Sequence, residues 1–214
     1  MSRGVPALLV ARGITRRLGD RVVLDGVDLD IAAGEAVGVA GPNGSGKSTL
    51  LRCLVGRDRP DAGEVVLAGR ELDEPRPDVR RDLAVVLDDL DFFPDLSVVE
   101  HLDLLARAHG VPDAEECVDQ VIAEAGLMEV SGQLPSTLSS GQRRRLVLAG
   151  AFVRPRRLLV LDEPEQRLDE QGLDWLGERL LAEKSAGRGV VLVSHRADLV
   201  ARVCDRVVDL GAIR

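Results

Sequence analysis

A chain of 214 residues, 45% hydrophobic and 30% charged, has the composition of one globular domain large enough to bury a core. The formal net charge of −8 argues against a general nucleic-acid binder, because phosphate contacts require a basic surface. Three widely separated cysteines predict neither a disulfide framework nor a metal site, and no segment approaches the roughly 20 apolar residues of a membrane span. We therefore expect a cytoplasmic domain whose cysteines are small buried apolar residues.

Short apolar segments alternate with amphipathic helices, which is the pattern of a sheet with crossover helices. The first segment, Gly4 to Ala11, is short and arginines follow it, which favours a strand over a signal peptide. The early strands are short and linked by turns, which indicates an antiparallel edge, whereas the later ones are apolar throughout, as buried parallel strands are. The other predicted strands are Val22–Leu24, Leu29–Ile31, Ala36–Ala40, Val65–Leu67, Leu83–Leu87, Leu158–Leu161, Val190–Val193 and Arg206–Asp209.

The strand Ala36–Ala40 continues directly into GPNGSGKST, which matches the phosphate-loop pattern G-x-x-x-x-G-K-[ST]. Its glycines let backbone amides turn toward phosphate oxygens, Lys47 brings a charge to the β and γ phosphates, and Ser48 offers a hydroxyl to magnesium. The helix that follows adds the positive end of its dipole. This context predicts a nucleoside triphosphate site formed by Gly41, Pro42, Asn43, Gly44, Ser45, Gly46, Lys47, Ser48 and Thr49.

From residue 88 to residue 141 the strand pattern disappears, and we predict a helical insert rather than a separate domain. Its helices include Val99–His109 and Ala114–Leu127. His101 and His109 have no partner at metal-ligand spacing and are expected to be solvated helix residues. One face of the second helix carries Val118, Val121, Ile122 and Ala125.

The segment LSSGQRRRLVLA, residues 138–149, predicts the start of another helix. Ser139 or Ser140 is suited to be its N-cap. The three arginines Arg143–Arg145 then fall in the first turn, where cations are unfavourable unless an anion is near. Helical spacing of the apolar residues is seen at Leu146, Ala149, Gly150 and Val153.

Two further strands end in residues suited to phosphoryl chemistry. Asp162, at the end of Leu158–Leu161, can hold magnesium through water, and Glu163 can orient or deprotonate the attacking water. His195 follows Val190–Val193 and is placed to sense the γ-phosphate, because the carboxyl ends of parallel strands form ligand crevices. The simpler alternatives are an acidic turn that closes a strand and a histidine without function.

The motifs GPNGSGKST, LSSGQ, LLVLDEP and VSH, in this order and at these distances, resemble those of the ATP-binding cassette (ABC) ATPases. The resemblance covers essentially the whole chain. It implies one ATP-binding domain over residues 1–214, of α/β class, with a P-loop NTPase core of mainly parallel sheet, an antiparallel β edge and the helical insert. It also implies ATP and Mg²⁺ as cofactors.

The resemblance further implies a head-to-tail dimer in which the LSSGQ signature faces the ATP of a second cassette. Ser139, Gly141 and Gln142 would contact the γ-phosphate held by that cassette. The charge that Arg143–Arg145 meet stays open, with solvent or the acidic surface as the simpler alternatives. The signature residues are Leu138, Ser139, Ser140, Gly141 and Gln142.

The chain departs from the family on the adenine side. Family members commonly stack adenine on an aromatic residue before the phosphate loop, but here Leu18 occupies that position and no aromatic residue precedes Phe92. Apolar contact from Leu18, or a guanidinium from Arg16 or Arg17, would have to replace the ring. We therefore expect weak or unselective recognition of the base.

Five other positions, in three segments, also differ. Asp88 stands where the family has a glutamine near magnesium; it can ligate the ion directly or through water, or it belongs to an acidic surface turn. Ser140 replaces a glycine and should be tolerated. Glu165, Gln166 and Arg167 replace small residues near the dimer interface and would favour a particular partner. The phosphate-loop, acidic and histidine residues are intact, so we expect a working ATPase with Glu163 and His195 as its catalytic residues.

Family members without a membrane span of their own usually power a separate integral membrane permease. This resemblance implies a position on the inner face of the cell membrane. Phe92 and Phe93 lie near the expected docking region, where packing within the insert is the alternative to contact with a partner. Two other functions stay open: a regulatory module that binds nucleotide but hardly hydrolyses it, and a soluble cassette that acts outside transport. No nucleic-acid partner is expected. The sequence does not indicate which substrate is transported or in which direction. It also does not indicate whether the cassette pairs with an identical or a different one.

Overall fold

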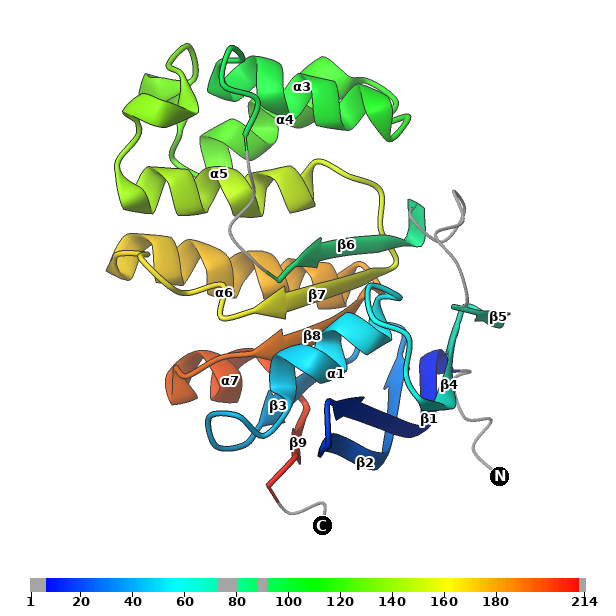
Figure 1. Cartoon of the computed structure of the whole chain (residues 1–214). Helices are drawn as coiled ribbons and strands as arrows, with labels where there is room; N and C mark the ends of the chain where they lie inside the picture. Colours follow the sequence, from blue (N-terminus) through cyan, green and yellow to red (C-terminus); the bar gives the residue numbers. More distant parts are fainter. Residues whose placement is uncertain (1–6, 73–80, 88–91, 212–214) are drawn as a thin grey trace.

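The computed structural model describes residues 7–72, 81–87 and 92–211, which form two sheets and a group of helices beside them (Figure 1). The larger sheet is parallel and has the strand order β6-β7-β8-β3-β9. Its strands match the predicted ones to within one residue at each end. They are β3 (Ala36–Ala40), β6 (Leu83–Val86), β7 (Leu158–Asp162), β8 (Gly189–Val193) and β9 (Arg206–Asp209).

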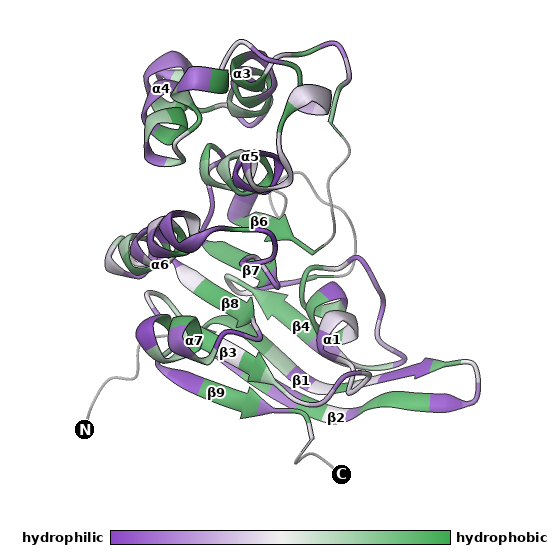
Figure 2. Ribbon diagram, turned by 90° about the vertical axis from the view of Figure 1, so that its left-hand side faces the viewer, coloured by the Kyte–Doolittle hydropathy of each residue, from purple (hydrophilic) through white to green (hydrophobic). Residues whose placement is uncertain are grey.

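Alternate residues of the parallel strands point into two separate cores, as the period of two in a strand requires. Val191 packs with the core that contains helix α1, whereas Val190 and Leu192 pack with the core on the other face. Figure 2 shows α5, α6 and α7 along one face and α1 on the other. These helices are α1 (Lys47–Leu54), α5 (Ser140–Phe152), α6 (Glu170–Ser185) and α7 (Ala197–Val203).

The antiparallel edge is a second sheet with the order β2-β1-β4-β5. The two short strands predicted at Val22–Leu24 and Leu29–Ile31 are wrong as separate elements, because they are parts of one 12-residue strand. Gly26 adopts a positive φ of 63° and its N–H donates to Thr15 Oγ1 at 3.1 Å, so the chain bulges there and pairing with β1 continues. The strands are β1 (Ala7–Leu18), β2 (Arg21–Ala32), β4 (Ala62–Leu67) and β5 (Arg70–Glu71).

The helical insert lies over α5, and no strand occurs among its described residues, 92–141. The predicted apolar face of α4 is buried. No helix in the described ranges combines the length and apolarity that crossing a membrane requires. The elements of the insert are α3 (Val98–Ala108), α4 (Ala114–Glu124) and the 3₁₀ turns Met128–Val130 and Pro135–Thr137.

The two histidines of the insert are not the solvated residues that we expected. His101 is only 5% exposed, because it shares a face of α3 with Val98 and Leu102. Its ring centroid lies 5.2 Å from that of Phe92 and 5.7 Å from that of Phe93, and burial lowers its pKa. His109 follows α3 as its C-cap and is half-buried.

Cys53 is buried as predicted, whereas Cys117 and Cys204 are half-buried, and all three are free thiols. Burial raises the pKa of Cys53 and of Cys204 to about 11. Both groups are therefore protonated and unreactive at neutral pH.

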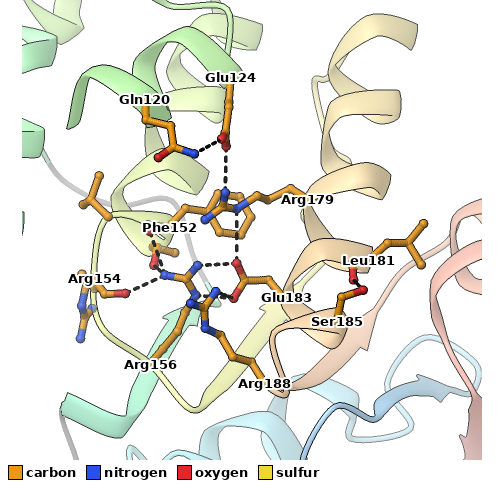
Figure 3. A network of polar contacts seen from close by, with 12 residues as sticks. Gln120, Glu124, Phe152, Arg154, Arg156, Arg179, Leu181, Glu183, Ser185 and Arg188 are labelled. Atoms are coloured by element: carbon orange, nitrogen blue, oxygen red, sulfur yellow. Dashed lines mark hydrogen bonds and ion pairs between the residues drawn. The ribbon is translucent and has the colours of Figure 1, made fainter. Parts of the chain in front are cut away.

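A buried ionic network joins the insert to the core (Figure 3). The Glu183 side chain on α6 is fully buried, and its Oε2 accepts from Arg156 Nε at 2.7 Å and from Arg188 Nη1 at 3.0 Å. Arg179 Nε lies 3.3 Å from Glu183 Oε1, and Arg179 Nη1 donates to Glu124 at the end of α4 at 2.8 Å. The network therefore runs from the insert through α6 to the segment that precedes β7.

Candidate functional site

The phosphate loop lies between β3 and α1, in the strand–loop–helix context that the sequence predicts. Gly46 has a φ of 96°, and a Cβ there would lie 2.8 Å from Leu24 Cδ2, so this position requires glycine. The N-cap residue Gly46 has no side chain to cap the first turn of α1, which leaves the amide groups of that turn available to an anion. Lys47 Nζ donates to the carbonyls of Gly41 at 2.8 Å and Pro42 at 3.1 Å, so its charge lies over the loop.

A cleft of about 590 Å³ opens above this loop and contains residues from four distant parts of the chain. Lys47 and Ser48 from α1 line it together with Glu163 and His195, as expected for a nucleotide site. Asp162, the LSSGQ segment and the two arginines before Leu18 are not among its lining residues. Asp88 lies outside the described residues. The lining consists of Leu18, Arg21, Val23, Asn43, Gly44, Gly46, Lys47, Ser48, Thr49, Glu163 and His195.

Glu163 and His195 form a pair at adjacent strand ends. Glu163 Oε1 lies 2.8 Å from His195 Nε2, and Gln166 Nε2 donates to the other carboxylate oxygen. Glu163 has a positive φ of 45°, and its N–H donates to the carbonyl of Val193 at 2.8 Å. The pair therefore places a fixed carboxylate at the cleft, where it can take a proton from water bound there.

The three arginines of the LSSGQRRR segment meet carbonyl and carboxylate groups rather than solvent alone. Arg144 is buried and donates to three successive carbonyls, those of Asp162 at 3.3 Å, Glu163 at 2.7 Å and Pro164 at 3.1 Å. The alternative of a solvated side chain is wrong for Arg144, because α5 packs against the turn after β7 and the carbonyls of that turn need donors. Arg144 holds the backbone of Glu163, a role that the sequence did not indicate.

The neighbouring arginines have other partners. Arg145 donates to Asp169 Oδ1 at 2.5 Å, which is the acidic partner that we considered, and to the carbonyl of Ala125 at 3.2 Å. The hydrogen bond from Arg145 lowers the pKa of Asp169. The exposed Arg143 donates to the carbonyl of Pro135 at 2.9 Å.

The signature helix α5 begins as predicted, with Ser139 as its N-cap. Ser139 Oγ accepts from the N–H of Gln142 at 3.2 Å, and Gln142 Oε1 accepts from the N–H of Ser139 at 2.9 Å, which completes a capping box. Ser139 and Ser140 are exposed. A Cβ at Gly141 would lie 3.1 Å from the carbonyl oxygen of Arg167, so the helix start packs closely on the loop after β7. Contact with a second cassette stays a prediction.

On the adenine side, Leu18 is 53% exposed and lines the cleft. The guanidinium that also lines it comes from Arg21, whose Nη2 donates to the carbonyl of Gly44 at 3.2 Å. The sequence reasoning missed Arg21 and favoured Arg16 or Arg17. Arg16 instead donates to Asp61 at 3.1 Å, which holds it away from the cleft lining.

We expect ATP and GTP to bind with affinities that differ by less than about tenfold, or ~1.4 kcal/mol. Leu18 offers apolar contact to either base, and no aromatic residue precedes Phe92 to stack on the base from this side of the cleft. Leu18→Tyr should tighten both complexes by ~1–3 kcal/mol, the usual contribution of base–aromatic stacking. Isothermal titration calorimetry on a hydrolysis-deficient variant measures both effects, and a strong preference for ATP in the unmodified site would contradict the expectation.

Comparison with known proteins places these features in context. The model of the family "ABC transporter" matches residues 24–166. The "Nod factor export ATP-binding protein I" of Cupriavidus metallidurans is 36% identical over 211 residues, which cover 96% of this chain and 69% of that protein. A "Spermidine/putrescine import ATP-binding protein" of Pseudomonas aeruginosa is 38% identical over 193 residues, 89% of this chain and 53% of that one. The chain thus spans about half the length of the second relative.

Solved structures agree with this comparison. One described as an ATP-binding subunit of an ABC transporter has a TM-score of 0.87 and 28% sequence identity, with 95% of this chain and 87% of that chain covered. A dimeric ATP-binding cassette in a post-hydrolysis state, bound to ADP and Pi, has a TM-score of 0.80 and 25% identity, with 95% of each chain covered. Both share the α/β P-loop NTPase fold.

Proposed function

Because this chain belongs to the ABC transporter family of ATP-binding subunits, we propose that it hydrolyses ATP to power a separate transmembrane permease. One observation carries the proposal. Lys47 on the phosphate loop and the Glu163–His195 pair line the same cleft, although these residues come from three different strand ends. Lys47 supplies positive charge for the phosphates of ATP. The pair supplies Glu163 as a general base and His195 as the residue that orients it.

The residues of the cleft divide the reaction between them. The loop amides and the α1 dipole bind the phosphates, and Lys47 moves from its two carbonyl partners to the β and γ phosphates. Glu163 accepts a proton as water attacks the γ-phosphorus, and the bond to the bridging oxygen of ADP breaks. His195 holds the carboxylate through Nε2 and faces the γ-phosphate.

The residues present fit a magnesium ion. Ser48 at the cleft and Asp162 at the end of β7 offer a hydroxyl and a carboxylate, the hard oxygen donors that Mg²⁺ prefers. No cluster of three or more metal-ligating side chains exists within the described ranges, so phosphate oxygens and water would complete the coordination. Magnesium supplies charge neutralisation of the phosphates when bound.

Two surfaces of the chain are suited to partners. The exposed signature serines lie outside the chain's own cleft, which supports a head-to-tail pair with a second cassette. Phe92 is half-buried and packs against the core, so packing explains it, whereas Phe93 is 55% exposed beside the insert and is the better candidate for permease contact. The relatives named above serve export and import alike, so neither a direction nor a cargo is proposed.

The test is phosphate release from Mg-ATP by the purified chain. Glu163→Gln should lower the rate by about 10²–10⁴-fold, because it removes the base but keeps the shape of the side chain. Glu129→Gln, an exposed residue of the insert, is the matched control and should leave the rate unchanged. ATP binding without release in the unmodified chain would favour the regulatory module instead.

A further inference from the structure

We propose that Glu165 is a positioning residue that holds His195 against Glu163, an inference that rests on the proposed function. Glu165 Oε1 accepts two hydrogen bonds from the turn that follows β8, from Ser194 Oγ at 2.7 Å and from the N–H of His195 at 2.9 Å. Ser194 Oγ in turn accepts from the N–H of Arg196 at 3.0 Å. One carboxylate oxygen thereby organises three successive residues of the turn.

The His195 ring needs such support. Its side chain is 57% exposed, and its ring has a hydrogen bond only to Glu163, among the contacts of the described residues. An exposed ring with one partner keeps a 2.8 Å contact only if its backbone is fixed. The bonds from Glu165 fix that backbone at the residue whose ring makes the contact.

The arrangement is costly for a purely structural role. Glu165 Oε2 is buried and has no hydrogen-bond partner in the part of the chain that the structure describes. A buried acceptor without a partner is destabilising, and a second carboxylate two residues along the chain from that of Glu163 adds charge repulsion. The backbone bond from Glu163 to Val193 already joins the two strand ends. The additional contribution of Glu165 is to fix the position of His195.

Glu165 acts through His195 and does not line the nucleotide cleft. Its loss should therefore slow the chemical step and leave ATP binding intact. For Glu165→Ala we expect kcat to fall by about tenfold or more, since a misplaced catalytic group costs up to ~10²-fold, while the Kd for ATP changes by less than about twofold. Glu165→Gln keeps an acceptor oxygen of the same reach and should recover most of the rate.

The decisive readout is the NMR spectrum of the His195 ring, which is independent of hydrolysis. The chain has three histidines, so its ring signals can be assigned with a His195→Gln variant. In Glu165→Ala the His195 ring signals should move toward those seen in Glu163→Ala, which removes the partner of the ring, and in Glu165→Gln they should stay near the unmodified ones. Glu170→Ala is the charge control, because Glu170 is 86% exposed and reaches only Arg196, at 3.8 Å, in the contacts described.

Unmoved His195 signals in Glu165→Ala, or a loss of ATP affinity as large as the loss of kcat, would overturn the proposal. So would a Glu165→Gln variant as impaired as Glu165→Ala. If Glu165→Ala does not fold, Ser194→Ala removes one of the two donors and should shift the ring signals partway in the same direction. Absence of hydrolysis in the unmodified chain would refute the proposed function. The His195 ring signals would still test whether Glu165 positions that ring.

Discussion

Glu163→Gln is expected to double its molar mass when ATP and magnesium are added, and to remain monomeric without them. Glutamine keeps the shape that contacts His195 but does not accept the proton of the attacking water, so ATP stays intact in the cleft. The γ-phosphate then supplies an anion for the start of α5 of a second copy, where Ser139 and Ser140 are exposed. Light scattering with and without nucleotide measures the change.

Two controls separate ATP-driven pairing from nonspecific association. Lys47→Ala, combined with Glu163→Gln, removes the positive charge that binds the phosphates. It should abolish both ATP binding and the rise in molar mass. Ser139→Glu places a negative charge at the helix start, so it should preserve ATP binding and prevent pairing. If Glu163→Gln binds ATP and stays monomeric, pairing of identical cassettes is wrong, and closure requires a different cassette or the permease.

That the phosphate-loop residues, Glu163 and His195 lie at one cleft could be predicted, because these parts are local or are related by simple topology. The phosphate loop is one contiguous segment, and its glycines and Lys47 follow directly from a strand. Glu163 and His195 follow two strands that pair in parallel, and parallel strands bring their carboxyl ends to one edge of the sheet. Their 2.8 Å contact is therefore a consequence of strand order, not of a motif.

The supporting side chains could not be predicted, because their partners are set by tertiary packing. The sequence left the partner of Arg144 open, and the structure shows that α5 packs against the turn after β7 and buries the Arg144 guanidinium beside three carbonyls. Glu165 bonds to residues 29 and 30 positions away. Arg21 lines the cleft in place of Arg16, because Arg16 is hydrogen-bonded to Asp61. No periodicity or spacing in the sequence encodes these choices.

The errors in the fold prediction have a similar origin. Val22–Leu24 and Leu29–Ile31 were expected to be short strands linked by a turn, but pairing with β1 on both sides of Gly26 makes the connection a bulge within β2. His101 was expected in solvent because it has no partner at metal-ligand spacing, yet its position on the buried face of α3 buries it. Local residue preference indicated the elements, and packing decided their extent.

The largest effect on stability is expected at Glu183, which packs within the ionic network of Figure 3 and is not among the residues that line the cleft. Glu183→Gln leaves Arg156, whose side chain is 3% exposed, without a full counter-charge. Breaking a buried ion pair from one side costs about 3–5 kcal/mol, because the remaining charge stays buried and uncompensated. Urea unfolding at pH 7 measures the loss, and Glu178→Gln, 76% exposed on the same helix, should show almost none.

The dependence of this loss on pH identifies the ion pair as its cause. Burial raises the pKa of Glu183, but the hydrogen bond from Arg156 and the charges of Arg188 and Arg179 outweigh it, so the pKa lies below its ordinary value of 4.5. A lowered folded-state pKa gives stability that is complete above the unfolded value and is lost as pH falls through the folded one. The difference between Glu183→Gln and the unmodified chain should therefore narrow below pH 4.5. The double variant Arg156→Met/Glu183→Leu should regain part of the loss, because it removes the uncompensated buried charge of Arg156, while Arg179 keeps Glu124 and Arg188 is 36% exposed. A difference that stays constant with pH would assign the loss to packing instead.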